Sequence, residues 1–242
     1  MLRITKLAVA GLLTLTALAG GASSSASNVV PTRLCADLAQ QHFTVEVLGD
    51  SIAWGYGSPD SKRWSNQLWD QLPPGSAVWN GAVSGSFVAD YMPGGQYYFH
   101  TQFAKAVQPT LVIMNWRVND QWMSIGHSAE GYTPAVFKSR YRQVLNELRT
   151  ASPTTTLAIA VSPWLLDTRI DQGQYKQQDY IQVLRELRVE FDALWIDWTR
   201  FFPKAGQSDS AGLLMYDLGH PSQSGQSVMA GQTWEWLHGY CS

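Results

Sequence analysis

Short apolar runs that alternate with helical patterns constrain the fold of this chain more than any other feature of its sequence. Runs rich in apolar and β-branched residues predict five strands, at 43–48, 77–80, 111–115, 157–161 and 194–196. Helical patterns predict helices at 66–72, 136–148 and 180–191, and a last helix that begins with Pro221 and ends near residue 237. The Gly- and Tyr-rich stretch 91–100 is interpreted as a surface loop. Strands that alternate with helices favour an α/β fold, in which helices cover both faces of a parallel sheet.

The first 26 residues have the layout of a secretory signal peptide. Arg3 and Lys6 precede an apolar run at 7–19, and small residues follow at 20–26. The apolar run is too short for a transmembrane helix, and an uncleaved N-terminal anchor is the alternative. We therefore expect a signal peptide at 1–26 and a single domain at 27–242, secreted and without a membrane span.

Charge and composition exclude several classes of protein. The chain has 17 basic and 19 acidic residues, and loss of Arg3 and Lys6 with the leader changes its net charge from −2 to −4. A chain that is nearly neutral and has no basic run is not typical of a nucleic-acid-binding protein. A hydrophobic content of 45% is too high for a disordered chain. The mature protein is expected to be a monomer.

The sequence contains two cysteines, which lie near the two ends of the mature chain. Cys35 follows the predicted leader closely, and Cys241 is the penultimate residue. An oxidising compartment favours a disulfide between them, and two free thiols are the alternative. No Cys-x-x-Cys pattern or Cys/His cluster is present, so a zinc site of the usual kind is not expected.

Residues suited to nucleophilic catalysis follow the predicted strands or precede the last helix. They are Ser51, Gly85, Asn119, Asp217 and His220. In parallel sheets such positions meet at the carboxyl ends of the strands. His220 can take the proton of the Ser51 hydroxyl, and Asp217 can orient the imidazole. The backbone N–H groups of Ser51 and Gly85 and the Asn119 amide can stabilise an oxyanion.

Each of these residues also has an ordinary explanation when it is taken singly. His220 is then a surface histidine, Asn119 a turn residue and Gly85 a loop glycine. The prediction therefore depends on the whole set in its order and context. Chemistry of this kind needs no metal or organic cofactor.

The same segments resemble the conserved blocks of the SGNH hydrolases, also called the GDSL lipase/esterase family. The matching segments are Gly49-Asp50-Ser51, residues 80–85, Arg117-Val118-Asn119-Asp120 and the pair Asp217 and His220. The resemblance extends over essentially the whole mature chain. It implies a three-layer α/β/α flavodoxin-like sandwich with Ser51 as nucleophile and with Gly85 and Asn119 as oxyanion donors. Motifs of α/β-hydrolases, P-loop proteins and zinc proteases are absent from the sequence.

One position departs from the family pattern, because Arg117 stands where the family usually has glycine. Arg117 could project at the mouth of the site and favour an anionic or polar substrate. It could equally pack on the outside of the protein, which is the interpretation we favour because most arginines lie at the surface.

Eleven tryptophans are present, and three of them lie beside the candidate site. Trp54 comes one turn after Ser51, and Trp116 and Trp122 flank Asn119. Together with Arg117 these three residues are the candidates for binding substrate, with core packing as the alternative. Core packing is favoured for the others considered, namely Trp64, Trp69, Trp195, Trp198, Trp234 and Trp236.

The sequence thus predicts a secreted serine esterase that hydrolyses carboxylic esters through an acyl-enzyme. An acetylated polysaccharide is slightly favoured as substrate over a lipid ester or another small ester. One alternative is an acyltransferase that passes the acyl group to a sugar or alcohol. The other is a non-catalytic carbohydrate-binding module that keeps the fold. Nothing in the sequence encodes the acyl chain length.

Overall fold

Five parallel strands form the centre of the protein in a computed structural model that describes residues 32–126, 131–204 and 207–242. The predicted signal peptide lies outside the described residues. The strands are β1 (Thr44–Gly49), β2 (Ala77–Asn80), β3 (Leu111–Asn115), β4 (Thr156–Val161) and β5 (Leu194–Asp197). Their order in the sheet is β2-β1-β3-β4-β5, and every neighbouring pair is parallel. The chain order therefore reverses at β1 and β3, the position where α/β sheets open a crevice for ligands.

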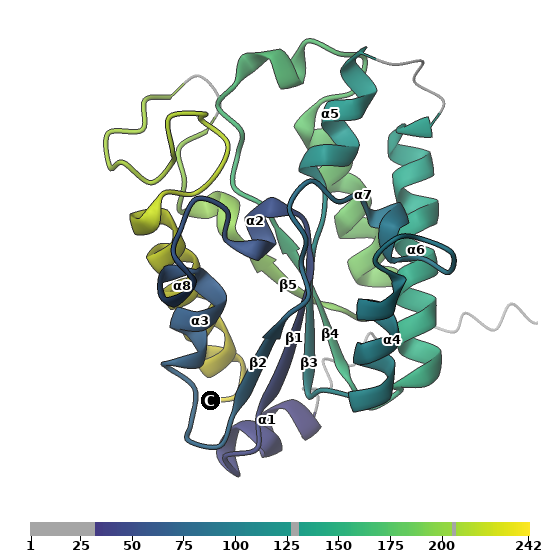
Figure 1. Ribbon diagram of the computed structural model, residues 1–242, viewed down its shortest axis with the longest axis vertical. Coiled ribbons are helices and arrows are strands. Elements are labelled where there is room, and N and C mark those ends of the chain that lie inside the picture. Colours follow the sequence, from purple (N-terminus) through teal and green to yellow (C-terminus); the bar gives the residue numbers. More distant parts are fainter. Residues whose placement is uncertain (1–31, 127–130, 205–206) are drawn as a thin grey trace, which may run out of the picture.

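Helices cover both faces of this sheet, which confirms the predicted three-layer α/β/α sandwich. Figure 1 shows α3 (Trp64–Trp69) and α8 (Gln223–Tyr240) on one face, and α4 (Tyr98–Val107), α6 (Pro134–Ala151) and α7 (Gln177–Glu190) on the other. Two short helices, α2 (Ser51–Trp54) and α5 (Val118–Gly126), directly follow β1 and β3. The helix α1 (Thr32–Ala39) lies at the amino end of the strands (Figure 1). Short 3₁₀ turns occur at Asp60–Lys62, Val88–Tyr91, Thr168–Asp171 and Trp198–Arg200.

Two apolar cores result from this arrangement, one on each face of the sheet. In β1, Val45 and Val47 belong to the core under α3 and α8, whereas Leu48 belongs to the core under α4, α6 and α7. This alternation follows from the two-residue period of a strand. Since both faces of the sheet are covered, the inner strands are apolar on both sides. This explains why their sequences are continuous apolar runs.

The predicted strands agree with the structure to within one residue at each end, but two other predictions need correction. The surface loop expected at 91–100 is confined to residues 92–97, because Tyr91 is fully buried and α4 begins at Tyr98. The last helix begins at Gln223 rather than at Pro221. Its first turn is capped by Ser222, whose hydroxyl accepts a hydrogen bond from the Gly225 N–H at 3.2 Å. The short helices α1, α2, α4 and α5 were not predicted, since their apolar patterns are too brief to detect.

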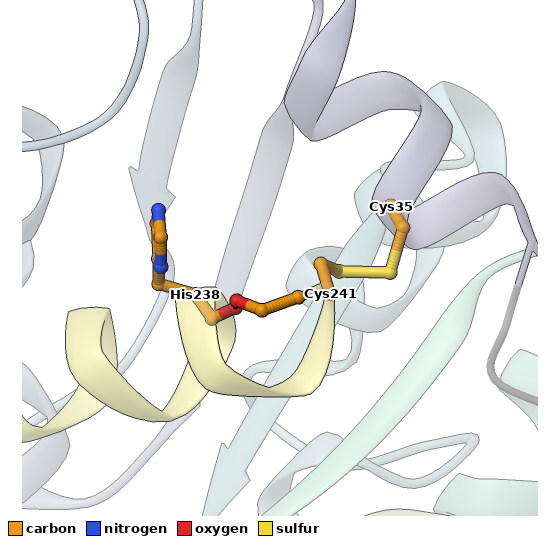
Figure 2. Close-up of a disulfide and its surroundings, with 4 residues drawn as sticks. Cys35, His238 and Cys241 are labelled. Carbon is orange, nitrogen blue, oxygen red and sulfur yellow. A yellow bond between two sulfur atoms is a disulfide. The ribbon is translucent and has the colours of Figure 1, made fainter.

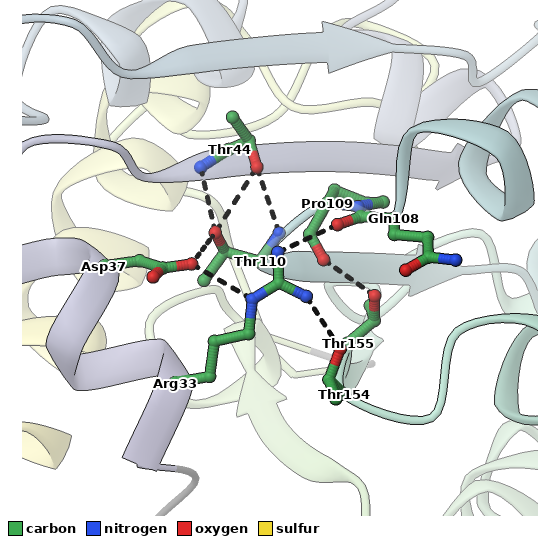
Figure 3. Close-up of polar contacts among 8 residues, drawn as sticks. All are labelled: Arg33, Asp37, Thr44, Gln108, Pro109, Thr110, Thr154 and Thr155. Atoms are coloured by element: carbon green, nitrogen blue, oxygen red, sulfur yellow. Dashed lines mark hydrogen bonds and ion pairs between the residues drawn. The ribbon is translucent and has the colours of Figure 1, made fainter.

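The predicted disulfide between Cys35 and Cys241 is present (Figure 2). It joins α1 to the residue that ends α8, over a sequence separation of 206 residues. Beside it, polar side chains attach α1 to the start of the sheet (Figure 3). The Thr110 hydroxyl donates to Asp37 at 2.6 Å, and the Arg33 guanidinium donates to Asp37, Thr154 and the Gln108 carbonyl. The N-terminal helix is thus held both covalently and by hydrogen bonds.

No helix in the described part of the chain is long and apolar enough to cross a membrane.

Candidate active site

Ser51 lies at the carboxyl end of β1, where the strand turns directly into α2. Asp50 caps this helix by accepting a hydrogen bond from the Ile52 N–H at 2.9 Å. The turn is tight at Gly49, because a Cβ there would lie 2.4 Å from the Asn115 carbonyl oxygen and 2.5 Å from the Ala53 Cβ. Glycine is therefore needed for the close approach that brings Ser51 to the edge of the sheet.

His220 and Asp217 reach Ser51 from the turn that precedes α8. The Nε2 atom of His220 lies 2.8 Å from the Ser51 Oγ, and its Nδ1 atom lies 2.6 Å from an oxygen of Asp217. The other Asp217 oxygen accepts hydrogen bonds from the backbone N–H groups of Gly219 and His220 at 3.0 and 2.9 Å. Leu218 adopts a left-handed conformation with φ +57°, which stores strain in this turn. The three predicted side chains therefore form a continuous hydrogen-bonded chain.

The Asp217 carboxylate is held in its ionised form. Burial acts to raise its pKa, but the hydrogen bonds from the backbone N–H groups of His220 and Gly219 and from the His220 ring outweigh this effect. The net pKa of Asp217 is therefore lowered. An ionised carboxylate beside Nδ1 keeps the proton on that nitrogen and leaves Nε2 free to accept the serine proton.

The other predicted hydrogen-bond donors lie in two further segments, at Gly85 and at Asn119. Gly85 is exposed and has φ +83°, a conformation that glycine adopts without strain. The Asn119 side-chain amide donates to the Ser86 carbonyl at 2.9 Å, next to Gly85. Among the hydrogen bonds of the described residues, the backbone N–H groups of Ser51 and Gly85 have no acceptor. The structure therefore joins Ser51, His220 and Asp217 directly and places the Asn119 amide next to Gly85. The role of Gly85 and Asn119 as oxyanion donors stays a prediction.

Two residues that the sequence did not single out hold the Gly85 loop against β1. The Ser86 hydroxyl donates to the Gly49 carbonyl at 3.0 Å. The Tyr91 hydroxyl lies 3.0 Å from the same oxygen and 2.9 Å from the Gly81 carbonyl oxygen. No sequence pattern marks Ser86, and Tyr91 was placed in the stretch interpreted as a loop. Both fix the distance between the two strand ends that carry Ser51 and Gly85.

The predicted substrate contacts of Trp116 and Arg117 are wrong, because both side chains are fully buried. Trp116 packs edge-on against Tyr91 and Tyr141 in the core under α6. Arg117 lies neither at the mouth of the site nor on the outside. Its guanidinium donates to Gln121 at 3.0 Å, to Gln177 at 3.1 Å and to the Pro163 carbonyl at 2.9 Å. Gln121 lies only four residues after Arg117, but Gln177 and Pro163 are remote in the sequence, so the sequence could not show this burial.

Trp54 and Trp122 are at least partly exposed, so both remain candidates for substrate contact. Trp122 is 43% exposed, and the Arg169 guanidinium lies 5.7 Å from its ring. The Trp54 ring has the Arg63 guanidinium over it at 3.9 Å and Tyr56 at 6.5 Å. Tyr56, which the sequence reasoning missed, is exposed and its ring lies 4.7 Å from that of His220. Its position two residues after Trp54 was the only available signal.

Two buried carboxyl groups lie behind the site. Burial raises the pKa of Asp50 to about 6, although the Ile52 N–H and the charges of His220 and Arg117 oppose this. Burial raises the pKa of Asp120 to about 7, against the hydrogen bond from the Val88 N–H. Within the described residues, each carboxyl has one oxygen without a hydrogen-bond partner. These groups are costly to bury, and the Asp50 carboxyl interacts electrostatically with His220.

Over the ranges 32–126, 131–204 and 207–242, no three His, Cys, Asp or Glu side chains gather in a way that could hold a metal ion.

Comparisons with known proteins identify the family of the chain and support its fold. The sequence profile of the GDSL-like lipase/acylhydrolase family matches residues 47–228. No curated protein matches the chain. Among solved structures, a lipolytic G-D-S-L family protein from Veillonella parvula DSM 2008 is 18% identical, with a TM-score of 0.61 over 80% of this chain and 97% of that one. TesA is 18% identical, with a TM-score of 0.62 over 81% and 99%. The acetyl xylan esterase AlAXEase is 16% identical, with a TM-score of 0.61 over 80% and 99%. At these identities the structures demonstrate a shared fold.

Proposed function

The chain belongs to the GDSL-like lipase/acylhydrolase family of carboxylic ester hydrolases, and on this basis we propose that it is a secreted serine esterase whose catalytic triad is Ser51, His220 and Asp217. The observation that carries this proposal is the unbroken contact from the Ser51 Oγ through the His220 ring to Asp217, at 2.8 and 2.6 Å. The same three side chains serve in turn as nucleophile, base and orienting group.

In the proposed reaction, the Ser51 Oγ attacks the ester carbonyl carbon while His220 Nε2 takes the hydroxyl proton. The tetrahedral intermediate collapses, its bond to the alcohol oxygen breaks, and His220 returns the proton to that oxygen. A water molecule then attacks the acyl-enzyme by the same route and releases the carboxylic acid and free Ser51. Asp217 stays ionised throughout and stabilises the imidazolium.

The oxyanion of both tetrahedral intermediates is proposed to bind three donors. These are the backbone N–H groups of Ser51 and Gly85 and the Asn119 side-chain amide. The two backbone groups are free of other acceptors in the described structure, and the second N–H of the Asn119 amide remains available beside its bond to Ser86. Donors that are already in place stabilise the developing charge without reorganisation.

For the substrate, we favour an acetylated carbohydrate over a lipid ester. Tyr56 places an aromatic ring next to His220, with Trp54 beside Tyr56, and such rings can lie against the apolar face of a sugar. One structural neighbour is an acetyl xylan esterase, which gives a further reason to test acetylated polysaccharide. Trp122 remains a second candidate for this contact.

Secretion is supported by the leader pattern at 1–26 and by the Cys35–Cys241 disulfide, since disulfides persist in oxidising compartments. Residues 27–242 are proposed to form one catalytic domain. Mass measurement of the protein from culture medium tests removal of the leader and formation of the disulfide. An intact leader, or two alkylatable thiols in the native protein, would contradict them.

The deciding experiment compares the wild type with Ser51→Ala on nitrophenyl esters of increasing acyl length and on acetylated polysaccharide. We expect Ser51→Ala to lower kcat by about 10⁴-fold or more. The matched control is Ser139→Ala, which changes a serine on α6 and is expected to keep wild-type activity.

Equal rates for wild type and Ser51→Ala on every ester would overturn the triad proposal. Adding a sugar or glycerol acceptor separates hydrolysis from acyl transfer. A product ester that forms faster than free acid would show an acyltransferase.

A further inference from the structure

A cavity between the sheet and α4 contains Glu46, an ionisable residue that the proposed reaction does not use. It has a volume of about 440 Å³ and is called here the Glu46 cavity. Its lining combines residues of β1 and β2 with three residues of α4, namely Glu46, Val78, Trp79, Asn80, Gly81, Phe99, His100 and Phe103. None of these residues belongs to the triad or donates to the oxyanion.

Glu46 is the unusual member of this set. It is the only charged residue of β1, it is 1% exposed, and its Oε2 atom has no hydrogen-bond partner among the described residues. Burial raises the pKa of Glu46 to about 9, so its side chain is a neutral carboxylic acid at neutral pH. An unpaired carboxyl in the interior costs free energy, and no contact in the described structure offsets that cost.

Protein cations do not neutralise Glu46. No Lys, Arg or His nitrogen of the described residues lies within 4.0 Å of its carboxylate. The lysine of α4, Lys105, is paired instead with Glu147. His100 faces the same space, because a Cβ at Gly81 would lie 2.6 Å from Glu46 Oε1 and 2.7 Å from His100 Nδ1. Burial lowers the pKa of His100, so the imidazole is neutral and can accept a hydrogen bond.

Aromatic rings form the walls beside this carboxyl group. Trp79 pairs with Glu46 across β2 and β1, so both side chains lie on the same face of the sheet. The Phe103 ring meets Trp79 edge-on at 5.6 Å, and the Phe99 ring lies 4.0 Å from that of His100. Phe99 and Phe103 are 57% and 40% exposed, so the cavity is open to solvent on this side. The Asn80 side chain already donates hydrogen bonds to the Ala53 carbonyl and the Ser65 hydroxyl and accepts one from the Ala82 N–H.

A carboxylate surrounded by aromatic rings is suited to one class of ligand. Aromatic faces and a carboxylate both attract cations, and the attraction increases where water is excluded. A sugar would need several donors and acceptors around its ring, and most of those near the cavity are already used. We propose that the Glu46 cavity binds a small ligand through an alkylammonium group, with Glu46 as counter-ion, His100 as acceptor and the rings of Trp79, Phe99 and Phe103 against its carbon atoms.

This assignment predicts that binding of the ligand releases a proton. A cation bound next to Glu46 favours the carboxylate, so the acid proton is released to buffer as the ammonium ion binds. We expect about one proton to leave for each ligand bound near pH 7. A neutral ligand would release none.

The test is titration calorimetry of the mature chain with n-butylammonium, with 1-butanol as its neutral isostere. The experiment is run in phosphate and in HEPES, which carry no primary ammonium group and whose ionisation enthalpies differ. We expect butylammonium to bind at least about tenfold more tightly than butanol, with an observed enthalpy that depends on the buffer. Glu46→Gln should weaken binding by about tenfold or more and abolish the buffer dependence. Glu190→Gln, the same change at an exposed ion pair, should leave the affinity and the buffer dependence unchanged.

Phe103→Ala provides a second variant that does not depend on Glu46→Gln folding correctly. Phe103 is partly exposed, so its loss should be tolerated while affinity for butylammonium falls by about two- to fivefold. The proposal is overturned if butanol binds as well as butylammonium, if Glu46→Gln binds normally, or if no butylammonium binds. Binding of glucose without proton release would instead show a sugar site. None of these results bears on the triad, because ester hydrolysis is measured separately.

Discussion

Ionisable side chains of α1 at the amino end of the β-sheet pair with their neighbours, whereas three at the carboxyl end are fully buried and each keeps a polar atom without a partner in the described structure. At the amino end, Arg33 and Asp37 of α1 form an ion pair, and Asp37 also accepts a hydrogen bond from the buried Thr110 hydroxyl. At the carboxyl end, Asp50, Arg117 and Asp120 are fully buried, and each has one polar atom without a partner in the described structure.

This difference indicates what each end contributes. Paired groups and a disulfide at the amino end stabilise the chain termini. Unpaired buried charges at the carboxyl end cost stability, and they lie where a reaction that develops charge takes place. We therefore expect changes at the amino end to alter stability alone, and changes at the carboxyl end to alter activity or pH dependence.

The largest effect is expected for Asp217→Asn. The asparagine oxygen can still accept the two backbone N–H groups of the turn, but its amide no longer stabilises the imidazolium. We expect kcat to fall by about 10³- to 10⁴-fold with little change in melting temperature. Steady-state kinetics on a nitrophenyl ester and thermal unfolding measure both. A fall in kcat of less than about tenfold would remove Asp217 from the proposed triad.

Removal of the disulfide should have the opposite effect, lowering stability while leaving activity unchanged. In the double variant Cys35→Ser and Cys241→Ser, a cross-link across 206 residues is lost from the unfolded chain. The free energy of unfolding should fall by up to about 5 kcal/mol. Denaturant unfolding measures this loss, and kcat at 25 °C should stay within about twofold of wild type. A large loss of kcat in the folded variant would show that the two ends of the sheet are coupled.

A pH effect is expected from Asp120, whose pKa burial raises to about 7 from an ordinary value of 3.8. Between these values the unfolded chain has lost a proton that the folded chain keeps, so this group lowers stability as pH rises from about 4 to 7. Asp120→Asn removes the penalty and can keep the Val88 hydrogen bond. We expect the variant to gain up to about 4 kcal/mol over wild type near pH 8 and little near pH 4.

Urea unfolding at both pH values measures this difference for Asp120→Asn. A gain of the same size at both values would mean that Asp120 does not titrate in this range.

The smallest effect is expected at the amino end, for Thr110→Val. Its hydroxyl donates to Asp37 and accepts from the Thr44 N–H, and the side chain is buried. Loss of these bonds should lower the free energy of unfolding by about 1 to 3 kcal/mol and leave kcat/KM unchanged. Equilibrium unfolding and ester kinetics on the same sample provide the check. A change in kcat/KM without a change in stability would contradict the division between the two ends.

Local patterns in the sequence determined the strands and most of the site. Apolar runs mark strands wherever both faces of a sheet are buried, as at Leu111–Asn115. Ser51, Gly85, Asn119, Asp217 and His220 were identifiable because each follows a strand end or precedes the last helix, and parallel strands place such positions at one edge. The pairing of Cys35 with Cys241 followed from the count of two.

Only the tertiary structure decided what surrounds these residues. Arg117 is buried because Gln121, Gln177 and the Pro163 carbonyl accept hydrogen bonds from its guanidinium, and two of these partners, Gln177 and Pro163, are remote in the sequence. The same holds for Trp116, for Tyr56 beside His220 and for the unpaired carboxyl of Glu46. Backbone periodicity is a local property, which a sequence displays directly. The partners of a buried polar side chain come from elements far apart in the chain, and they are determined only when those elements pack.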